Sequence, residues 1–386
     1  MKVLVLGGAG IVGKAIAKDL VEQADVSKVV LADMNVERAE KYLNMLGSPK
    51  ATAQFLDASD YDNLVKVMKD FDVIANSVYY GLVIPITKAA VEAKTHCVDL
   101  GGFWYGTLKQ MDMNEEIEKA GITVLHGCGS GPGLNNVICR YAADRMDRLE
   151  TIDIRAGGAA PAPDSKGVTG AGMTIQTVLD EKAMNPNIFE DGEYKKVPSI
   201  SGAEVVKFPD PIGEQTAYFS LHSEPLTLSK NIKTVQSANI KVVFPKEEIE
   251  KLTPLIEAGL ASREPVEFKG HTIVPREFLD FLMVKREQGI EGEGREFCAT
   301  VIYMAGQKNG EAVKMTYDYI IEHDKKWGNT KTGVPFSIGV LMVGRGEITK
   351  RGFTFPEIAI DPVKFIDECR KRGFVFTEKE EYIRNI

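Results

Sequence analysis

Residues 2–13 read KVLVLGGAGIVG, a short apolar run that passes directly into a glycine-rich turn. Gly8, Gly10 and Gly13 match the pattern GxGxxG. The first glycine permits a tight turn, the second lets the backbone approach a pyrophosphate, and the third lets the following helix pack closely on the sheet. The first N–H groups of that helix, which include those of Ile11 and Val12, would face the anion. The stretch therefore predicts a strand, a phosphate-binding turn and a helix in direct succession.

An acidic residue stands at the spacing that such a turn requires. Asp33 follows Gly13 by 20 residues, at the end of the next predicted strand. A carboxylate at that position can accept hydrogen bonds from an adenosine ribose, and it would repel a 2′-phosphate. NAD is therefore favoured over NADP, although Arg38 nearby leaves NADP, or use of both, open. The alternative is a tight glycine turn in a fold that binds no nucleotide.

The rest of the N-terminal part has the pattern of a parallel sheet with crossover helices. Short apolar runs alternate with amphipathic stretches, and this alternation predicts a doubly wound Rossmann domain over residues 1–145. The strands are expected at 2–6, 28–32, 53–56, 73–76, 97–100 and 123–126. The helices are expected at 11–22, 35–46, 61–69, 85–93 and 109–120.

Two further segments complete the predicted α/β architecture. With 386 residues the chain exceeds the usual size of a single core. Strand-like runs separated by Gly, Pro and Asp turns predict an inserted, mixed α/β substrate domain over residues 146–330. Its glycine-rich stretch 157–172 is expected to be a lid or binding loop. Residues 331–386 are expected to return as helices and pack on the first domain.

Composition and charge exclude several classes of protein. The net charge of −8 and the pI near 5.4 disfavour nucleic acid and anionic membranes as partners. The five cysteines include no CxxC pair, and the histidines show no HxxxH or HxH spacing, so we expect neither a disulfide framework nor a catalytic metal. We expect a cytoplasmic protein that acts on a small molecule. Edge strands of the second domain would need cover, which favours a homodimer.

Further cofactor contacts are expected where predicted strands end. Asp57 and Ala58 follow the third strand, and Asn76 and Ser77 lie at the end of the fourth. Ligands of open parallel sheets bind at these carboxyl ends. Gly133 precedes a predicted helix whose free N–H groups could meet a carboxylate or the nicotinamide amide. Turn capping, or an ordinary helix start, is the alternative for each of them.

Several motifs together resemble the saccharopine dehydrogenase family, and within it most closely the lysine 6-dehydrogenase branch. Besides the GGAGIVG turn and LADMN at 31–35, these are CVDLGG at 97–102, GSGPGLNN at 129–136, VPSISGAE at 197–204 and GRGEITKRGFTFPE at 344–357. The segment SLHSEPLTL at 220–228 differs from the Ser/Gly-rich segment of that branch. The resemblance implies an NAD(P)-dependent oxidoreductase that acts on a carbon–nitrogen bond of an amino acid. The favoured substrate is the terminal amine of L-lysine or of a related basic amino acid, and a saccharopine or carboxyalkyl-polyamine dehydrogenase is the alternative.

That chemistry requires a base, a group that positions water, and a cation for the substrate carboxylate. Asp99 is the first catalytic candidate, because it ends a strand and could hold an ammonium group. His222 and Glu224, spaced i and i+2 in an expected strand, would act as proton acceptor and orienting group. The candidates for substrate binding are Tyr80, Gly101, Gly102 and, for the carboxylate, Arg155.

Two other functions fit the same sequence. Cys128 follows a predicted strand and could be the nucleophile of an aldehyde dehydrogenase. A redox-sensing regulator that binds NAD without catalysis is the second alternative.

Overall fold

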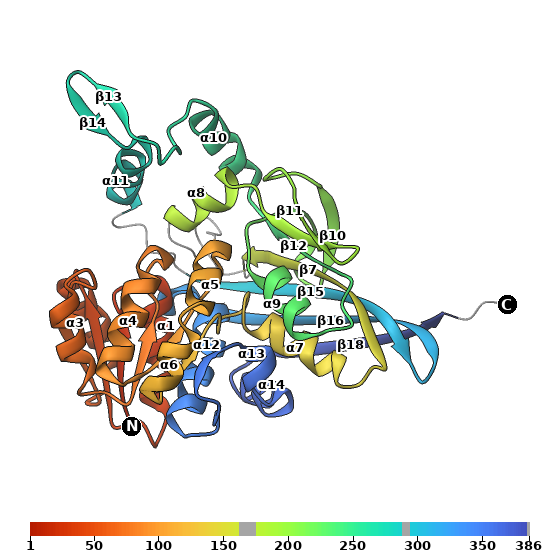
Figure 1. Ribbon diagram of the computed structural model, residues 1–386, viewed down its shortest axis with the longest axis horizontal. Coiled ribbons are helices and arrows are strands. Elements are labelled where there is room, and N and C mark those ends of the chain that lie inside the picture. Colours follow the sequence, from red (N-terminus) through yellow and green to blue (C-terminus); the bar gives the residue numbers. More distant parts are fainter. Residues whose placement is uncertain (162–174, 288–293, 384–386) are drawn as a thin grey trace.

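The computed structural model describes residues 1–161, 175–287 and 294–383, and its N-terminal part is a parallel sheet covered by helices (Figure 1). The strands are β1 (Lys2–Leu6), β2 (Lys28–Asp33), β3 (Ala51–Phe55), β4 (Val73–Asn76), β5 (His96–Asp99), β6 (Thr123–Leu125) and β17 (Gly352–Thr354). The helices are α1 (Ile11–Glu22), α2 (Val36–Leu46), α3 (Tyr61–Met68), the short η1 (Tyr80–Leu82), α4 (Val83–Ala93), α5 (Trp104–Met111) and α6 (Asn114–Ala120). The strand order β17-β6-β5-β4-β1-β2-β3 confirms the predicted doubly wound sheet.

Both faces of this sheet are buried, as the continuous apolar strands require. Val3 and Val5 of β1 belong to the same core cluster as residues of α1 and α2. Leu4 and Leu6 point to the other face, where they join residues of α3, α4 and α6. Because successive side chains of a strand alternate between faces, one apolar strand supplies two cores. The order of strands reverses between β1 and β4, and the loops that follow these two strands therefore diverge and leave a crevice.

One predicted helix of this domain is wrong in extent. The amphipathic stretch 109–120 is divided between α5 and α6, which meet at Asp112 and Met113. The break lets the Asn114 side chain accept a hydrogen bond from the Phe353 N–H at 2.8 Å. The partner strand β17 comes from the far end of the chain, so the sequence around residue 112 does not predict it.

The second domain is built on a mixed sheet of nine strands. These are β7 (Arg148–Pro161), β8 (Asn187–Glu190), β9 (Glu193–Lys196), β10 (Glu204–Phe208), β11 (Gly213–Phe219), β12 (Ser237–Val243), β15 (Arg295–Lys308), β16 (Glu311–Asp324) and β18 (Val375–Ile383), with a separate hairpin of β13 (Val266–Phe268) and β14 (His271–Ile273). Residues 157–161 continue β7, where Ala159 and Ala160 pair with β15, so the loop expected there is wrong. The remainder of that expected loop, 162–172, lies outside the described residues.

Helices of the second domain flank its sheet, and two of them extend to the top of the view beside the β13–β14 hairpin (Figure 1). They are α7 (Leu134–Ala143), α8 (Ile175–Ala183), α9 (Glu224–Asn231), α10 (Lys246–Glu257) and α11 (Pro275–Glu287). In the described ranges 1–161, 175–287 and 294–383, no helix is both long and apolar enough to cross a bilayer.

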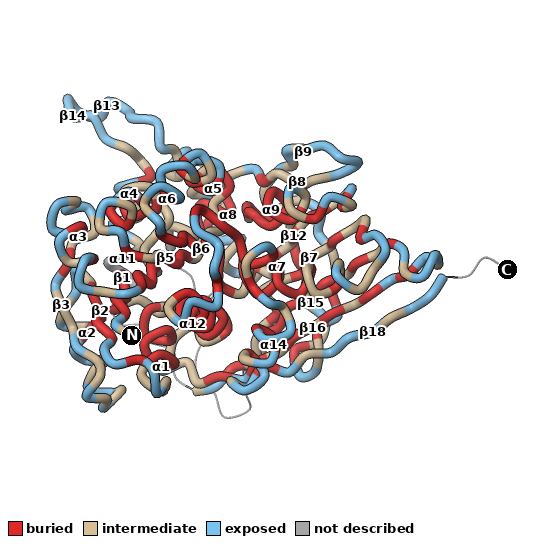
Figure 2. The backbone as a smooth tube through the Cα atoms, turned by 60° about the horizontal axis from the view of Figure 1, so that its bottom comes forward, coloured by how far each residue is buried: buried red, intermediate tan, exposed pale blue. Residues whose placement is uncertain are grey.

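The C-terminal segment contributes a strand to the sheet of each domain. It contains η2 (Lys325–Trp327), α12 (Thr330–Gly344), α13 (Pro356–Ala359) and α14 (Pro362–Lys371). Helix α12 is almost wholly buried (Figure 2) and packs so closely on α1 that a Cβ on Gly333 would come 2.6 Å from the Cβ of Ala15. Strand β17 then extends the first sheet beside β6, as the expected return implies. The chain afterwards leaves this domain, because β18 pairs with β16 of the second sheet.

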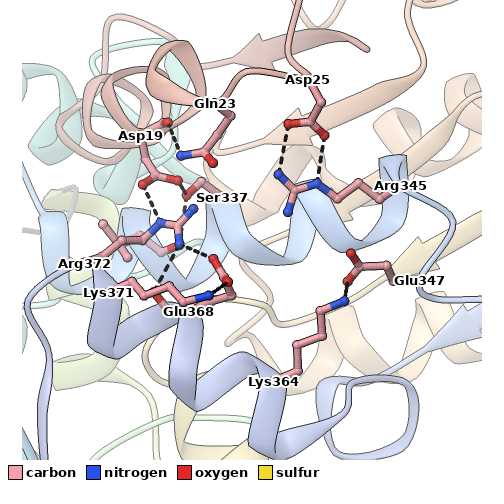
Figure 3. Close-up of polar contacts among 11 residues, drawn as sticks. Asp19, Gln23, Asp25, Ser337, Arg345, Glu347, Lys364, Glu368, Lys371 and Arg372 are labelled. Carbon is pink, nitrogen blue, oxygen red and sulfur yellow. Dashed lines mark hydrogen bonds and ion pairs between the residues drawn. The ribbon is translucent and has the colours of Figure 1, made fainter.

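Ion pairs anchor this returning segment to α1 (Figure 3). The carboxylate of Asp19 accepts hydrogen bonds from the Ser337 hydroxyl and, at 2.6 Å, from the Arg372 guanidinium. The side chains of Asp19 and Arg372 are only 7% and 12% exposed. Asp25 pairs with Arg345 in the same region, but these side chains are 43% and 31% exposed.

The two pairs should differ in their contribution to stability. We expect Asp19→Ala to lower the free energy of unfolding by about 3 kcal/mol, because it leaves a nearly buried guanidinium without its main counter-ion. Asp25→Ala should cost less than about 1 kcal/mol, because solvent screens an exposed pair. Chemical denaturation of both variants measures the difference. Equal losses would show that burial of Asp19 does not matter.

Candidate active site

A cleft lies in the crevice between β1 and β4, where residues of both domains and of the C-terminal segment meet. Ten residues predicted from the sequence line it: Gly10, Ile11, Val12, Asn76, Ser77, Tyr80, Asp99, Gly101, Gly102 and His222. Thr177, Glu181 and Leu221 of the second domain also line it, as do Asn329 and Thr332, of which Asn329 donates its N–H to the Ile11 carbonyl. The strand ends of the first domain are therefore joined in the cleft by side chains from distant parts of the sequence.

The glycine turn has the geometry of a phosphate cradle. A Cβ on Gly8 would come 2.7 Å from the Leu31 Cα, and one on Gly13 would come 2.2 Å from the Gly7 carbonyl oxygen. No side chain in the described part of the chain caps α1, which begins directly after Gly10. The first N–H groups of a helix have no partner within it, so this end of α1 is open to an anion. The residues present fit a dinucleotide pyrophosphate.

Asp33 lies beside this cradle at the end of β2. Its carboxylate accepts hydrogen bonds from the backbone N–H groups of Ala9, at 3.0 Å, and Asn35, at 2.9 Å. These bonds fix the carboxylate next to the turn, where an adenosine ribose would lie.

Six predicted cofactor residues do not line the cleft: Gly8, Gly13 and Asp33 form or adjoin the glycine turn, whereas Asp57, Ala58 and Gly133 lie elsewhere. Asp57 and Ala58 follow β3, beyond Asp33 in the sheet, and the Asp57 carboxylate accepts bonds from the N–H and hydroxyl of Ser59. Their contact with an adenosine stays a prediction. Gly133 has φ of 129°, and a Cβ there would come 2.1 Å from the Gly129 carbonyl oxygen. Gly133 therefore shapes the turn before α7 and does not line the cleft.

Asp99 holds the floor of the cleft together. Its carboxylate accepts bonds from the N–H groups of Gly101 (2.9 Å) and Gly127 (3.3 Å) and from the Gln110 amide (2.9 Å), and the His126 Nδ1 lies 2.7 Å away. Burial alone would raise the pKa of Asp99, but His126 and these donors hold it below its usual value. Asp99 is 1% exposed and held by these donors, so it fixes the floor of the cleft that it lines, and its contact with a substrate ammonium stays a prediction.

His222 lies between two carboxylates on the other wall. Its Nδ1 is 3.2 Å from Glu224 Oε2, and its Nε2 is 3.5 Å from Glu181 Oε1. Burial would lower the pKa of His222, but the two carboxylates raise it to about 10. The ring is therefore cationic at neutral pH. This environment favours His222 as the orienting partner of the two carboxylates, and its role as proton acceptor stays a prediction.

The local structure of this pair also differs from the prediction. His222 lies in the loop after β11, and Glu224 is the first residue of α9, so the expected strand is wrong. Pro225 in the first turn explains the difference, because proline is favoured at a helix start and cannot donate to a strand ladder. The turn nevertheless brings the two side chains together.

Glu181 is the functional residue that the sequence analysis missed. It lies on α8, lines the cleft and is 4% exposed. Its Oε1 faces His222, whereas its Oε2 is buried without a hydrogen-bond partner among the described residues. A buried carboxylate oxygen without a partner is costly, so a ligand that donates a proton or carries positive charge would be favoured there. Glu181 is therefore suited to receive an amine.

A second acidic residue of α8 joins the two domains beside the cleft. Asp180 accepts hydrogen bonds from the hydroxyls of Tyr79 (2.9 Å) and Tyr80, and from the Arg276 guanidinium at 2.7 Å. The ring of Tyr80 stacks on Phe103 with centroids 4.6 Å apart. Tyr80 thus forms a fixed wall of the cleft, and α8 carries Glu181 to its place on the opposite side.

Family models match nearly the whole chain. The saccharopine dehydrogenase NADP binding domain matches residues 3–125, and the saccharopine dehydrogenase C-terminal domain matches residues 129–374. The chain belongs to the saccharopine dehydrogenase family. It is an NAD(P)-dependent oxidoreductase of the kind that acts on amine or amino-acid substrates.

Full-length relatives and a solved structure agree with this membership. Carboxyaminopropylagmatine dehydrogenase of Synechocystis is 25% identical over 400 residues, which cover 98% of this chain and 97% of that protein. Carboxynorspermidine synthase of Vibrio cholerae is 24% identical over 389 residues, 92% of either chain. The apo saccharopine dehydrogenase (L-Glu forming) of Saccharomyces cerevisiae matches with a TM-score of 0.73 at 20% identity, over 98% of this chain and 99% of that one. This last likeness confirms the fold.

Preference between NAD and NADP in this saccharopine dehydrogenase family member should depend on Asp33. We expect Asp33→Ala to raise the KM for NAD about tenfold, the value of one charge-assisted hydrogen bond, and to change that for NADP less than about threefold. Steady-state rates with each cofactor measure this. An unchanged ratio of the two KM values would remove Asp33 from the ribose site.

Arg155 does not lie in the cleft. This β7 side chain donates to Glu204 at 2.9 Å and to the Asn239 side chain at 2.8 Å. A buried guanidinium needs such partners, and Glu204 of β10 and Asn239 of β12 supply them. The expectation that Arg155 binds the substrate carboxylate is therefore wrong.

Cys128 is equally unsuited to the role of nucleophile. Its side chain is fully buried, and burial raises the pKa of the thiol well above its usual value. A Cβ on Gly339 of α12 would come 2.3 Å from its sulfur, so the thiol is packed against that helix. This geometry disfavours the aldehyde dehydrogenase alternative.

Proposed function

We propose that this protein catalyses reversible hydride transfer between a nicotinamide cofactor and the carbon of a C–N bond. The substrate is a secondary amine whose nitrogen carries a carboxyl-bearing carbon chain on one side and a basic amine on the other. The unpartnered Glu181 carboxylate oxygen, buried in the cleft opposite the glycine turn, carries the proposal, because it suits a cationic nitrogen. The names of the relatives support it, since they describe a carboxyaminopropyl derivative of agmatine and a carboxynorspermidine.

The geometry of the cleft assigns each residue a separate role in the proposed reaction. The cofactor, held by the glycine turn and Asp33, supplies or takes up the hydride when bound. In the oxidative direction Glu181 Oε2 would accept one proton from the cationic substrate nitrogen, and the resulting amine would become an iminium when its carbon loses the hydride. His222 orients Glu181 from one side, and Glu224 pairs with His222 from the other. Water then adds to the iminium carbon and releases an aldehyde and a primary amine.

Oxidation of the terminal amine of L-lysine, which the sequence motifs favoured, would use the same groups and release ammonia. The two substrates differ at the nitrogen: L-lysine has a primary amine, whereas the proposed substrate is a secondary amine with a second carbon chain on the nitrogen. An assay with defined substrates therefore separates them.

The deciding experiment follows reduced-nicotinamide absorbance with the purified protein and NAD or NADP. Saccharopine, L-lysine, L-ornithine and a series of carboxyalkyl polyamines are added in turn. Turnover with a secondary amine supports the proposal. Turnover with L-lysine alone would contradict the proposal and favour oxidation of the terminal amine of L-lysine. Silence with every substrate, together with tight nicotinamide binding, would favour a non-catalytic regulator.

A further inference from the structure

Three metal-ligating side chains meet on the second sheet, outside the cleft. Strand pairing of β15 with β16 places Glu296 directly opposite His323. Cys298 is two residues beyond Glu296 in β15, and it therefore shares the same face of the sheet. His323 Nε2 is 3.3 Å from Glu296 Oε1 and 3.6 Å from Cys298 Sγ. The sequence analysis did not connect these residues, because 25 positions separate Cys298 from His323.

These spacings are those of ligands around one ion. In a tetrahedral site with bonds of about 2.0 to 2.3 Å, neighbouring ligand atoms are about 3.3 to 3.8 Å apart. The three candidate ligand atoms all lie within 4.8 Å of one another. Glutamate oxygen, thiolate sulfur and imidazole nitrogen form a donor set that zinc-class ions bind in proteins. Alkaline-earth ions prefer oxygen ligands alone.

The three candidate ligand atoms are enclosed and share a single imidazole nitrogen between them. Glu296 and His323 are 8% and 6% exposed, and Cys298 is half-buried. A single His323 Nε2 faces both the sulfur and the carboxylate oxygen, and one N–H cannot donate fully to two acceptors. The His323 Nδ1 has no hydrogen-bond partner among residues 1–161, 175–287 and 294–383. An ion at the shared centre would satisfy sulfur, nitrogen and oxygen together.

Two lysines flank the cluster without occupying its centre. Lys325 Nζ lies 3.6 Å from the other oxygen of Glu296, so Oε1 stays available as a ligand. A cation in this position would orient the carboxylate as an outer partner. Lys331 donates to the Ala299 carbonyl at 2.9 Å. Its neighbour Thr332 lines the cleft, so the cluster adjoins the active site without sharing a side chain with it.

We propose that Glu296, Cys298 and His323 bind one divalent transition-metal ion of the zinc class, with a fourth position open to water. The thiol proton leaves to solvent on binding. This site is separate from the proposed hydride transfer and does not depend on it.

Metal titration of the chelator-treated full-length protein tests the proposal. We expect one equivalent of Co²⁺ to produce thiolate-to-cobalt absorption, and one equivalent of Zn²⁺ to displace it. Cys298→Ser should abolish the absorption and weaken Zn²⁺ binding more than about 100-fold. Removal of a residue that only hydrogen-bonds to a metal ligand typically weakens metal binding less than that. Glu296→Gln should weaken binding while it preserves side-chain shape. His271→Ala, which removes an exposed histidine on β14, is the matched control and should change neither signal.

Alkylation of the Cys298 thiol supplies a second measurement that does not depend on cobalt absorption. Bound Zn²⁺ should protect Cys298 from iodoacetamide, as peptide mapping would show, in protein whose circular dichroism matches the metal-free form. Absence of a stoichiometric ion, equal binding by Cys298→Ser, or bound cobalt without a thiolate band would each overturn the proposal. None of these results depends on turnover, so failure of the proposed function would leave the metal site standing.

Discussion

Replacement of Glu181 by glutamine is expected to reduce kcat about 1,000-fold, within the range that a positioned general base contributes. The change keeps the size of the side chain but removes the charge and the basic oxygen that faces the cleft. Binding of the nicotinamide cofactor should stay within about twofold, because the glycine turn and Asp33 belong to the first domain, whereas Glu181 belongs to α8 of the second. Stopped-flow turnover and cofactor fluorescence titration measure the two quantities separately.

Glu204→Gln is the matched control for this variant. Glu204 is another partly buried carboxylate of the second domain, and it pairs with Arg155 at 2.9 Å and Lys241 at 2.6 Å, outside the cleft. We expect kcat within about twofold of the unaltered enzyme. A comparable loss in both variants would indicate that general damage to the second domain explains the result. Retention of full turnover in Glu181→Gln would remove Glu181 from the chemistry.

The cofactor side of the site was predictable because its determinants are local. Gly8 and Gly13 act on the turn in which they stand, and Asp33 acts across one strand and one helix. Hydrophobic alternation in β1 likewise predicts a strand buried on both faces without knowledge of its neighbours. The edge strand β17 was not predictable in this way, because its residues follow the second domain in the sequence and yet extend the first sheet.

The substrate side was not predictable, because its partners come from distant elements. Asp180, Glu181 and Lys182 form a charged triplet of the kind that usually lies on a solvated helix face. In the structure all three are buried, since each meets a partner from another element: Tyr80, His222 and Glu248, respectively. Arg155 shows the converse, because its strand pairing, and not its charge, decides where the side chain lies. No spacing rule in one sequence gives these contacts.

The His222→Gln variant is expected to lower kcat about 100-fold at pH 7. Without the cation, the carboxylates of Glu181 and Glu224 lose the group that lies within 3.5 Å of both. Like charges that share a buried site repel each other, so Glu181 would lose the fixed position from which it accepts the substrate proton. Cofactor affinity should stay unchanged. His271→Gln, the same substitution at an exposed position, should leave turnover unchanged and serves as the control.

The pH profile separates this role of His222 from a merely structural one. The carboxylates raise the folded-state pKa of His222 to about 10, above its usual value of 6.5. The ion cluster should therefore stabilise the fold fully below pH 6.5 and lose its effect as the pH rises through about 10. Turnover of the unaltered enzyme should fall over the same alkaline range, as Glu181 loses its cationic neighbour. In His222→Gln both the decline in stability and this limb of the kcat/KM profile should disappear. An alkaline limb that persists unchanged in the variant would assign it to another group, and His222 would then only fill space beside Glu181.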